Sequence, residues 1–322
     1  MLFTIKATLA KLPHKVNYLG KNPDKYIQAY ENSIDVIAAQ QSDNKSDNSL
    51  ADKTDINEKK SISVKLSALH SRFEYSQHER VLKELAPKVL QLAEKAKQAG
   101  IGMTIDAEES DRLELTLDIF EAVFCSAKLN GWSGLGLAVQ AYQKRAMPVL
   151  QWLAELSRSR GRRIPLRLVK GAYWDTEIKR AQELGLASYP VFTRKLATDV
   201  SYLACARYIL SEPDAFYPQF ATHNAHTVAS IIEFAAAGCR YEFQRLHGMG
   251  EALYASIVDE KGMNIPCRVY APVGSHEDLL PYLVRRLLEN GANTSFVNRI
   301  EDENVSVEKV IADPVEQLVN LE

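Results

Sequence analysis

Short β-rich runs alternate with helical patterns along most of the chain after residue 60. The runs are too short to be buried helices, and the segments between them carry apolar residues at helical spacing. Strands that alternate with helices pair in parallel through right-handed crossovers. The seven runs are, in chain order, Ser61–Leu66, Gly102–Asp106, Leu135–Gln140, Pro165–Lys170, Gln219–His223, Tyr241–His247 and Pro266–Ala271.

This rhythm predicts an α/β fold, a distorted (β/α)8 barrel of the TIM type. Such a barrel needs one more strand before residue 61, and we place it at Val16–Leu19 in an atypical first strand and N-terminal arm. A doubly wound sheet is the alternative, but it would carry a GxGxxG turn after a strand. Gly134 and Gly136 precede a strand, and the sequence has no GxxxxGK loop either. Any nucleotide cofactor must therefore be held in another way.

Three parts of the chain differ in pattern. Residues 1–39 hold one helical stripe, expected over Asp24–Ala39, and residues 40–60 are polar enough to predict a flexible linker. Residues 61–322 are expected to form the barrel. Within them, helices are expected to begin at a capping box of Ser76 and Glu79, with a kink at Pro87, and at Thr193; another should end at Gly238.

Composition excludes several functions. The chain has 39 Lys and Arg against 41 Asp and Glu, so charge gives no reason to expect nucleic acid as a partner. No apolar run is long enough to span a bilayer, and Met1–Leu12 lacks a signal cleavage pattern. The four cysteines form no CxxC pair, which predicts a reduced, cytoplasmic protein.

Polar side chains mark the carboxyl ends of the predicted strands, the end of a barrel that carries the active site. A single polar strand end is commonly just solvated, but so many with long functional side chains favour a site. The residues are Lys65, Asp106, Gln140, Arg167, Lys170, Thr222, His223, Gln244 and Tyr270.

The last predicted helix, Ser275–Asn290, carries two adjacent arginines. Tyr282, Arg285, Arg286 and Glu289 share one face by their spacing. A solvated outer face is one interpretation. If the face is turned inward, Glu289 can offset one guanidinium, which leaves the other for a ligand carboxylate or phosphate.

Other chemistries stay open on the residues alone. His223 and His226 have no third ligand beside them, so a metal site is not expected. Lys65 or Lys170 could be the amine of a Schiff-base barrel lyase. Trp174 could pack in the barrel or offer a flat surface to an aromatic ring.

The chain resembles the proline dehydrogenase domain of the bifunctional bacterial PutA proteins. The resemblance runs from about residue 61 to the chain end and includes the tail Ala312–Leu318. It implies a distorted barrel that binds FAD non-covalently and without a dinucleotide fingerprint. The motifs that carry it are Ser63–His70, Ile105–Glu114, Gln140–Arg145, Arg167–Asp175, Phe220–Thr227, Phe243–Glu251 and Tyr282–Arg299.

For the substrate, the resemblance implies that Arg285 and Arg286 bind the carboxylate of L-proline. Lys65 would be a third cation, held in place by Asp106. Four further side chains would enclose the pyrrolidine ring: Tyr173, Leu246, Tyr270 and Tyr282.

For FAD, the resemblance places Gln140 at the isoalloxazine edge and Arg167 near N5. Thr193 and Lys195 would contact the phosphate or adenosine end. The other expected cofactor contacts are Asp106, Val169, Lys170, Gly171, Ala172, Trp174, Thr222, His223, Asn224, Gln244, Arg286 and Glu289.

The implied reaction is oxidation of L-proline to pyrroline-5-carboxylate by hydride transfer to flavin N5. Electrons would pass to a quinone-type acceptor, which requires at most peripheral contact with a membrane. The aldehyde dehydrogenase domain of the PutA proteins is expected to be absent from this chain. The alternatives are the Schiff-base lyase and a non-catalytic barrel that only binds a ligand.

Overall fold

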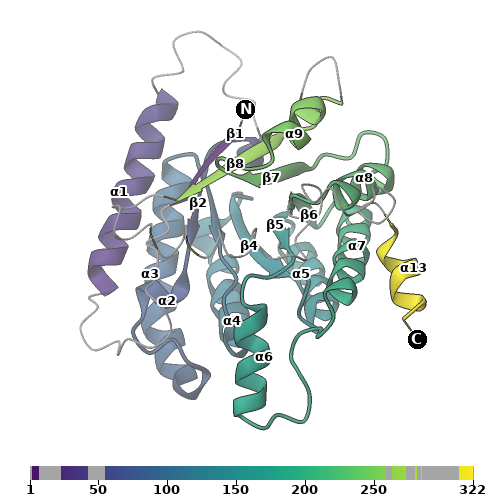
Figure 1. Cartoon of the computed structure of the whole chain (residues 1–322). Helices are drawn as coiled ribbons and strands as arrows, with labels where there is room; N and C mark the ends of the chain where they lie inside the picture. The colour runs from purple at the N-terminus through teal and green to yellow at the C-terminus, as the bar shows by residue number, and fades with distance from the viewer. Residues whose placement is uncertain are drawn as a thin grey trace.

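Eight parallel strands close into a barrel in the order β1 to β8 (Figure 1). This computed structural model describes residues 2–6, 23–42, 55–258, 263–272, 280, 284 and 312–321. The barrel confirms the fold class predicted from the alternating strands and helices. The strands are β1 (Leu2–Lys6), β2 (Ser61–Val64), β3 (Gly102–Ile105), β4 (Leu135–Gln140), β5 (Ile164–Val169), β6 (Phe216–Ala221), β7 (Glu242–Leu246) and β8 (Cys267–Pro272).

The first strand lies closer to the N-terminus than the sequence indicated. It is β1, and the prediction of Val16–Leu19 as the first strand was wrong; residues 7–22 lie outside the described part. Each of its five residues pairs with β8, whereas only Thr4 pairs with β2, at Ser61. The strand is thus set by pairing with the far end of the chain, which local sequence does not reveal.

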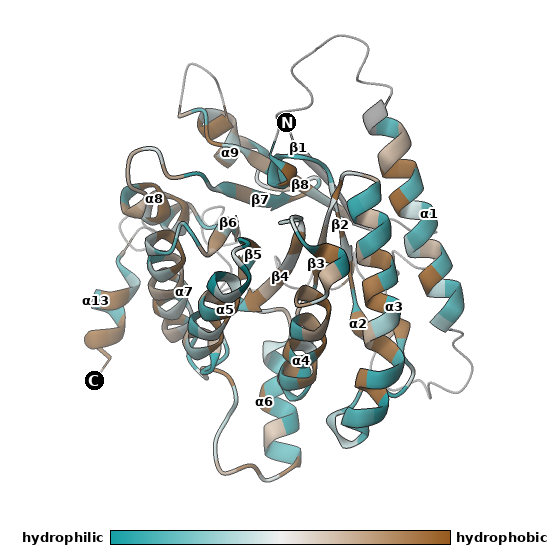
Figure 2. Cartoon of the chain, turned by 180° about the vertical axis from the view of Figure 1, so that it is seen from behind, coloured by the Kyte–Doolittle hydropathy of each residue, from teal (hydrophilic) through white to brown (hydrophobic). Residues whose placement is uncertain are grey.

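Helices surround the barrel, and Figure 2 shows apolar and polar residues alternating around the turns of α1 and α3. The core fills the space between strands and helices: α3 alone buries Val81, Leu85, Val89 and Leu92. The helices are α1 (Pro23–Ser42), α2 (Leu66–Leu69), α3 (His78–Gln98), α4 (Leu113–Phe124), α5 (Ala146–Arg160), α6 (Trp174–Glu183), α7 (Lys195–Ser211), α8 (Ala225–Phe234), α9 (Glu251–Val258) and α13 (Pro314–Val319). Short 3-10 turns are η3 (Ile56–Glu58), η4 (Tyr75–Gln77), η5 (Ser110–Arg112) and η6 (Ala127–Leu129).

Three predicted helix signals differ from the structure. The predicted capping residue Ser76 lies inside η4, and α3 begins at His78 without a side-chain cap. This helix is continuous through Pro87, because packing of its buried face outweighs the hydrogen bond that proline removes, and the kink expected there stays a prediction. Helix α7 begins after Arg194 rather than at Thr193, and α8 ends at Phe234, before Gly238.

Helix α1 covers the barrel beside β2 and α3 (Figure 1) and begins and ends close to the predicted bounds. It buries Tyr30, Ile34 and Ile37. The Tyr30 hydroxyl accepts a hydrogen bond from the Lys65 backbone N–H at 3.2 Å. Helix α1 thus reaches the residue that follows β2, at the end of the barrel where the polar strand ends meet.

The expected linker over residues 40–60 overlaps this helix at its start, and residues 43–54 lie outside the described part. The division of the chain into three parts stays a prediction. No helix in the described segments has the length and apolar character to span a membrane.

Candidate active site at the carboxyl end of the barrel

The expected polar residues lie at one end of the barrel because all eight strands run parallel. Lys65 directly follows β2, and Asp106 directly follows β3. Gln140 and Leu246 are the last residues of β4 and β7, and Thr222 directly follows β6.

Arg167 lies at the centre of this end and joins four strands. Its Nη1 donates to Asp106 Oδ1 at 2.7 Å, its Nη2 to Ser63 Oγ at 2.9 Å, and its Nε to Gln244 Oε1 at 2.7 Å. The guanidinium also lies 5.1 Å from the centroid of the Tyr270 ring. Only 4% of Arg167 is exposed, so the barrel holds a buried cation in a fixed orientation.

Asp106 binds two other expected site residues. Its Oδ1 accepts from Arg167 Nη1 at 2.7 Å, and its Oδ2 accepts from the Tyr270 hydroxyl at 3.2 Å. The expectation that Asp106 also holds Lys65 in place stays a prediction. The ion pair with Arg167 is buried on both sides. The charge-assisted hydrogen bond to the Arg167 guanidinium is the stronger of these two bonds. Asp106 therefore lies between two expected site residues, Arg167 and Tyr270.

Lys65 contacts Tyr173. Its Nζ donates to the Tyr173 hydroxyl at 3.1 Å. Burial by itself lowers the pKa of this amine, but Tyr173, Glu108 and Asp106 outweigh it and raise the pKa above the ordinary lysine value. Lys65 is therefore an ammonium at neutral pH, as a carboxylate-binding residue must be. A Schiff-base lysine needs a neutral amine, so this shift argues against that role for Lys65.

The segment after β5 depends on a glycine. Gly171 has φ +145°, and a Cβ placed on it would lie 2.4 Å from the Tyr142 ring. The next residue, Ala172, donates its N–H to Gln140 Oε1 at 3.3 Å, and Gln140 Nε2 donates to the Glu108 carbonyl at 2.8 Å. Gln140 thus ties the loop after β3 to the backbone after β5, with the flat Tyr142 ring directly below the glycine.

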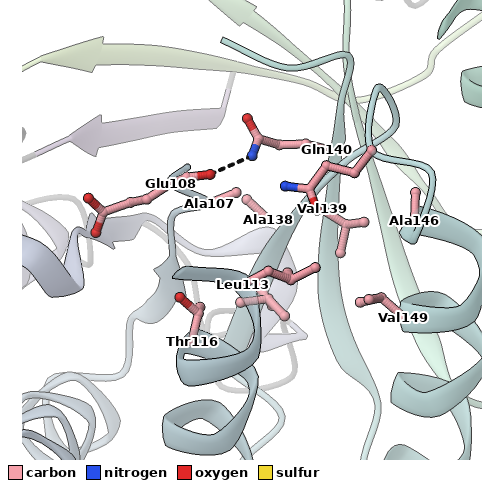
Figure 3. Close-up of a pocket in the computed structure, with 11 residues that line it drawn as sticks. Ala107, Glu108, Leu113, Thr116, Ala138, Val139, Gln140, Ala146 and Val149 are labelled. Atoms are coloured by element: carbon pink, nitrogen blue, oxygen red, sulfur yellow. Dashed lines mark hydrogen bonds between the residues drawn. The ribbon is translucent and has the colours of Figure 1, made fainter. Parts of the chain in front are cut away.

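A cavity borders Gln140 on the helix side of β4 (Figure 3). Figure 3 shows Leu113 and Thr116 of α4 lining it beneath the bond between Gln140 and Glu108. Val149 of α5 lines another side. The cavity lies between β4 and its covering helices, so it is distinct from the site around Arg167.

The start of α7 and the start of α6 bring several expected cofactor contacts together. Lys195 Nζ lies 5.8 Å from the centroid of the Trp174 ring, and Trp174 Nε1 donates to the Phe192 carbonyl at 2.8 Å. Lys170 forms an ion pair with Asp199 of α7. Thr193 is exposed beside them. This region thus combines positive charge with an aromatic face, a combination that suits an anionic or aromatic ligand.

The turn between β6 and α8 is fixed by its own polar groups. Thr222 Oγ1 accepts from the Asn224 N–H at 3.1 Å, and Asn224 Oδ1 caps α8 by accepting from the Thr227 N–H at 3.0 Å. His223 Nε2 accepts from the Leu246 N–H at 3.1 Å, which ties β6 to β7. Nε2 is thereby engaged, and among the described residues no group of three His, Cys, Asp or Glu could hold a metal.

Four expected site residues lie outside the described part: Tyr282, Arg285, Arg286 and Glu289. Of the predicted helix Ser275–Asn290, only residues 280 and 284 are described; both are helical, and their side chains are exposed. The contacts of the arginine pair therefore stay predictions.

The sequence interpretation missed three polar residues one step deeper in the barrel. Ser63 binds Arg167, and Glu242 and Arg268 form a buried ion pair. A period of two would have found them, because Ser63, Glu242 and Arg268 lie two positions before Lys65, Gln244 and Tyr270. The interpretation considered only the last residues of each strand.

The residues present suit a dinucleotide with an aromatic ring system. The half-buried apolar residues Val169, Ala172 and Leu246 lie where the strands end, around the buried cation of Arg167. Lys170 and Lys195 add positive charge farther out, and hydroxyl and amide groups stand at the start of α8. Apolar walls with a few placed polar groups are typical of cofactor sites, and the cations match phosphates. FAD fits this set of side chains.

Comparison with known proteins agrees with this geometry. The family model for proline dehydrogenase matches residues 14–299. The chain is 56% identical over 266 residues to the bifunctional protein PutA of Salmonella typhimurium, covering 81% of this chain and 20% of that protein. It is 57% identical over 258 residues to PutA of Rhizobium meliloti, covering 79% of this chain and 21% of that protein.

A solved structure matches as well. A crystal structure of a mutant of Bradyrhizobium japonicum proline utilization A (PutA) superposes with a TM-score of 0.88 and 47% sequence identity. The match covers 99% of this chain and 31% of that one. The chain spans about a fifth of the length of the two PutA relatives. Because the family model covers most of the chain, the chain belongs to the proline dehydrogenase family.

Proposed function

We propose that this chain oxidises L-proline to pyrroline-5-carboxylate with FAD as its cofactor. The family assignment supports the substrate and the reaction. The observation that carries the proposal is the convergence of two cations, Lys65 and Arg167, at the carboxyl end of the barrel beside half-buried apolar residues. One cation suits the substrate carboxylate, and the other suits an electron-accepting ring.

FAD, when bound, would supply the hydride acceptor at N5 and would pass the electrons on to a quinone-type acceptor. Arg167 would then face the ring, because its Nη1 and Nη2 each carry a second N–H besides those that bind Asp106 and Ser63. A fixed cation near the flavin stabilises the negative charge that reduction adds. Asp106 and Gln244 would act by keeping this guanidinium in place.

Farther along the cofactor, Lys170, Lys195 and Thr193 would serve the phosphate or adenosine end. Thr222, His223 and Asn224 would line its middle. Their support is position: Lys170 follows β5, Thr193 and Lys195 lie at the start of α7, and Thr222, His223 and Asn224 lie between β6 and α8. The remaining contacts that we propose are Val169, Gly171, Ala172 and Trp174, with Arg286 and Glu289 closing the cradle.

Substrate binding would rest on charge and on apolar walls. The Lys65 ammonium would pair with the proline carboxylate together with Arg285 and Arg286. Tyr173, Leu246, Tyr270 and Tyr282 would enclose the ring. When the carboxylate is fixed and the amine of proline is neutral, C5 of the ring is held in one orientation. Such positioning of the reacting atoms lowers the barrier to hydride release.

The two alternatives are less well supported. A Schiff-base lyase would need a neutral amine, whereas neighbouring charges raise the pKa of Lys65 and Lys170 is paired with Asp199. A barrel that binds proline without oxidising it has no use for a buried cation next to a cofactor site. We place the reaction in the cytoplasm, with at most peripheral contact with a membrane.

Reconstitution with FAD tests the proposal. The purified protein is incubated with FAD, with FMN or with neither, and proline is added while pyrroline-5-carboxylate is trapped as a coloured adduct. We expect product only with the flavin, and more with FAD than with FMN because of the cations at the phosphate end. Proline binding without product would favour the non-catalytic barrel, and borohydride trapping of substrate on a lysine would favour the lyase.

A further inference from the structure

A second layer of buried charge lies beneath the site, at positions the reaction does not touch. Glu242 of β7 is fully buried, and Arg268 of β8 is 1% exposed. Arg268 Nε donates to Glu242 Oε1 at 2.6 Å, and Nη2 donates to Oε2 at 2.7 Å, so the pair is bidentate. Such a pair needs further hydrogen bonds to offset the desolvation of two charges. Arg268 finds them at the backbone carbonyls of Asn57 and Lys59.

Gln244 connects this ion pair to the site. Its Nε2 donates to Glu242 Oε1 at 2.8 Å, and its Oε1 accepts from Arg167 Nε at 2.7 Å. Gln244 is 2% exposed, so water cannot replace either partner freely. A continuous series of buried hydrogen bonds therefore connects Arg268 through Glu242 and Gln244 to Arg167.

This series of hydrogen bonds allows only one orientation of the Gln244 amide. A carboxylate can only accept hydrogen bonds, and a guanidinium can only donate them. The amide must turn its NH₂ to Glu242 and its oxygen to Arg167. With Glu242 absent, the Gln244 NH₂ loses this acceptor, so only the bond to Arg167 still holds the amide and the side chain can shift with the guanidinium.

We propose that Glu242 is a positioning residue of the flavin site, acting through Gln244 on Arg167, with Arg268 neutralising it. The proposal rests on the proposed function, because it gives Arg167 its place beside the FAD ring. Its role is to fix the cation on which the reduction potential of the bound flavin depends. Glu242 itself contacts neither substrate nor cofactor in this account.

Two double variants isolate the hydrogen bond from the ion pair. Glu242→Met with Arg268→Met removes the pair without leaving a buried charge, a change that proteins often tolerate. Glu242→Gln with Arg268→Met also removes the pair but restores an acceptor for Gln244, and the Tyr217 hydroxyl, 3.5 Å from Glu242 Oε2, can accept from the new amide. Only the first variant removes the acceptor that Glu242 offers to the Gln244 NH₂.

The readouts are the reduction potential of bound FAD, the Kd for FAD and the rate of flavin reduction by proline. We expect the Met–Met variant to have a lower potential and a reduction rate lower by roughly 10- to 100-fold, the loss expected when a group at a reacting centre moves by about 1 Å. The Gln–Met variant should recover both to within about threefold of the wild-type rate. Equal potentials and rates in the two variants would overturn the proposal.

Gln219→Leu is the matched control. Gln219 donates to the same Oε1 of Glu242 at 3.0 Å but has no bond to Arg167, so its loss should leave potential and rate unchanged. If the Met–Met variant does not fold, Glu242→Asp keeps a carboxylate to balance the charge of Arg268 but draws the shared acceptor oxygen back from Gln244; a wild-type potential in that variant would also refute the role. Wild-type protein that binds no FAD would refute the proposed function instead.

Discussion

Replacing Asp106 with asparagine tests the ion pair at the centre of the site. The change keeps the shape of the side chain and an oxygen acceptor, but it removes the charge opposite Arg167. All the acceptors of Arg167 are then neutral: Ser63, Gln244 and the new amide oxygen at position 106. Removing one partner of a buried pair leaves an uncompensated charge, which costs about 3 kcal/mol or more.

This loss of free energy of unfolding gives a measurable shift in the midpoint of thermal unfolding. Unfolding entropy is about 2.1 cal/mol/K per residue, or about 0.7 kcal/mol/K for a chain of 322 residues. A loss of about 3 kcal/mol therefore lowers the midpoint of thermal unfolding of the flavin-free protein by about 4 °C. Circular dichroism at two protein concentrations measures this midpoint.

Asp199→Asn is the matched control, since it makes the same chemical change in a different ion pair. The side chains of Asp199 and Lys170 are 25% and 33% exposed, against 9% and 5% for Asp106 and Arg167. A partly exposed pair contributes under about 1 kcal/mol, so the midpoint should fall by about 1.5 °C at most. Equal shifts in the two variants would refute our account of Arg167 as a buried cation that depends on Asp106.

Three further variants test the site. Lys65→Met should raise KM for proline by about tenfold or more with FAD still bound, whereas Met at the exposed Lys144 should not. The pKa of Lys65 lies above the ordinary lysine pKa, so its ammonium charge is fully present at every pH below that ordinary pKa and is lost only at higher pH. The contribution of this charge to KM should therefore be constant from about pH 6 to about pH 9. Arg286→Met should raise KM for proline by orders of magnitude while flavin stays at least partly bound; unchanged kinetics would overturn the carboxylate assignment. Gly171→Ala should weaken FAD binding and lower stability, since its Cβ would meet the Tyr142 ring; a wild-type Kd for FAD would contradict this.

The sequence predicted most of the barrel because seven strands are continuous β-rich runs between helices with clear apolar stripes. Local signals failed where pairing is non-local. Strand β1 is recognisable mainly through its pairing with β8, which lies more than 250 residues later in the chain. The start of α3 was also misplaced, because a 3-10 turn rather than the predicted capping box precedes it.

Within the site, the sequence indicated which residues lie at the strand ends but not which of them bind one another. Asp106 directly follows β3 and Arg167 lies in β5, and their contact depends on the register of the strands and the curvature of the barrel. Glu242 and Arg268 lie two positions before the strand-end residues Gln244 and Tyr270. In a sequence, a charged side chain at such a position is easily attributed to a solvated face of the strand. Only the closed barrel reveals them as a buried pair.

Anaerobic titration with L-proline tests the central claim most directly. The protein is loaded with FAD, and the absorbance of the flavin at about 450 nm is followed as proline is added. Our account predicts that the band bleaches as flavin is reduced and that pyrroline-5-carboxylate forms in equal amount. Protein that takes up no FAD, or a flavin band that proline leaves unchanged, would contradict it.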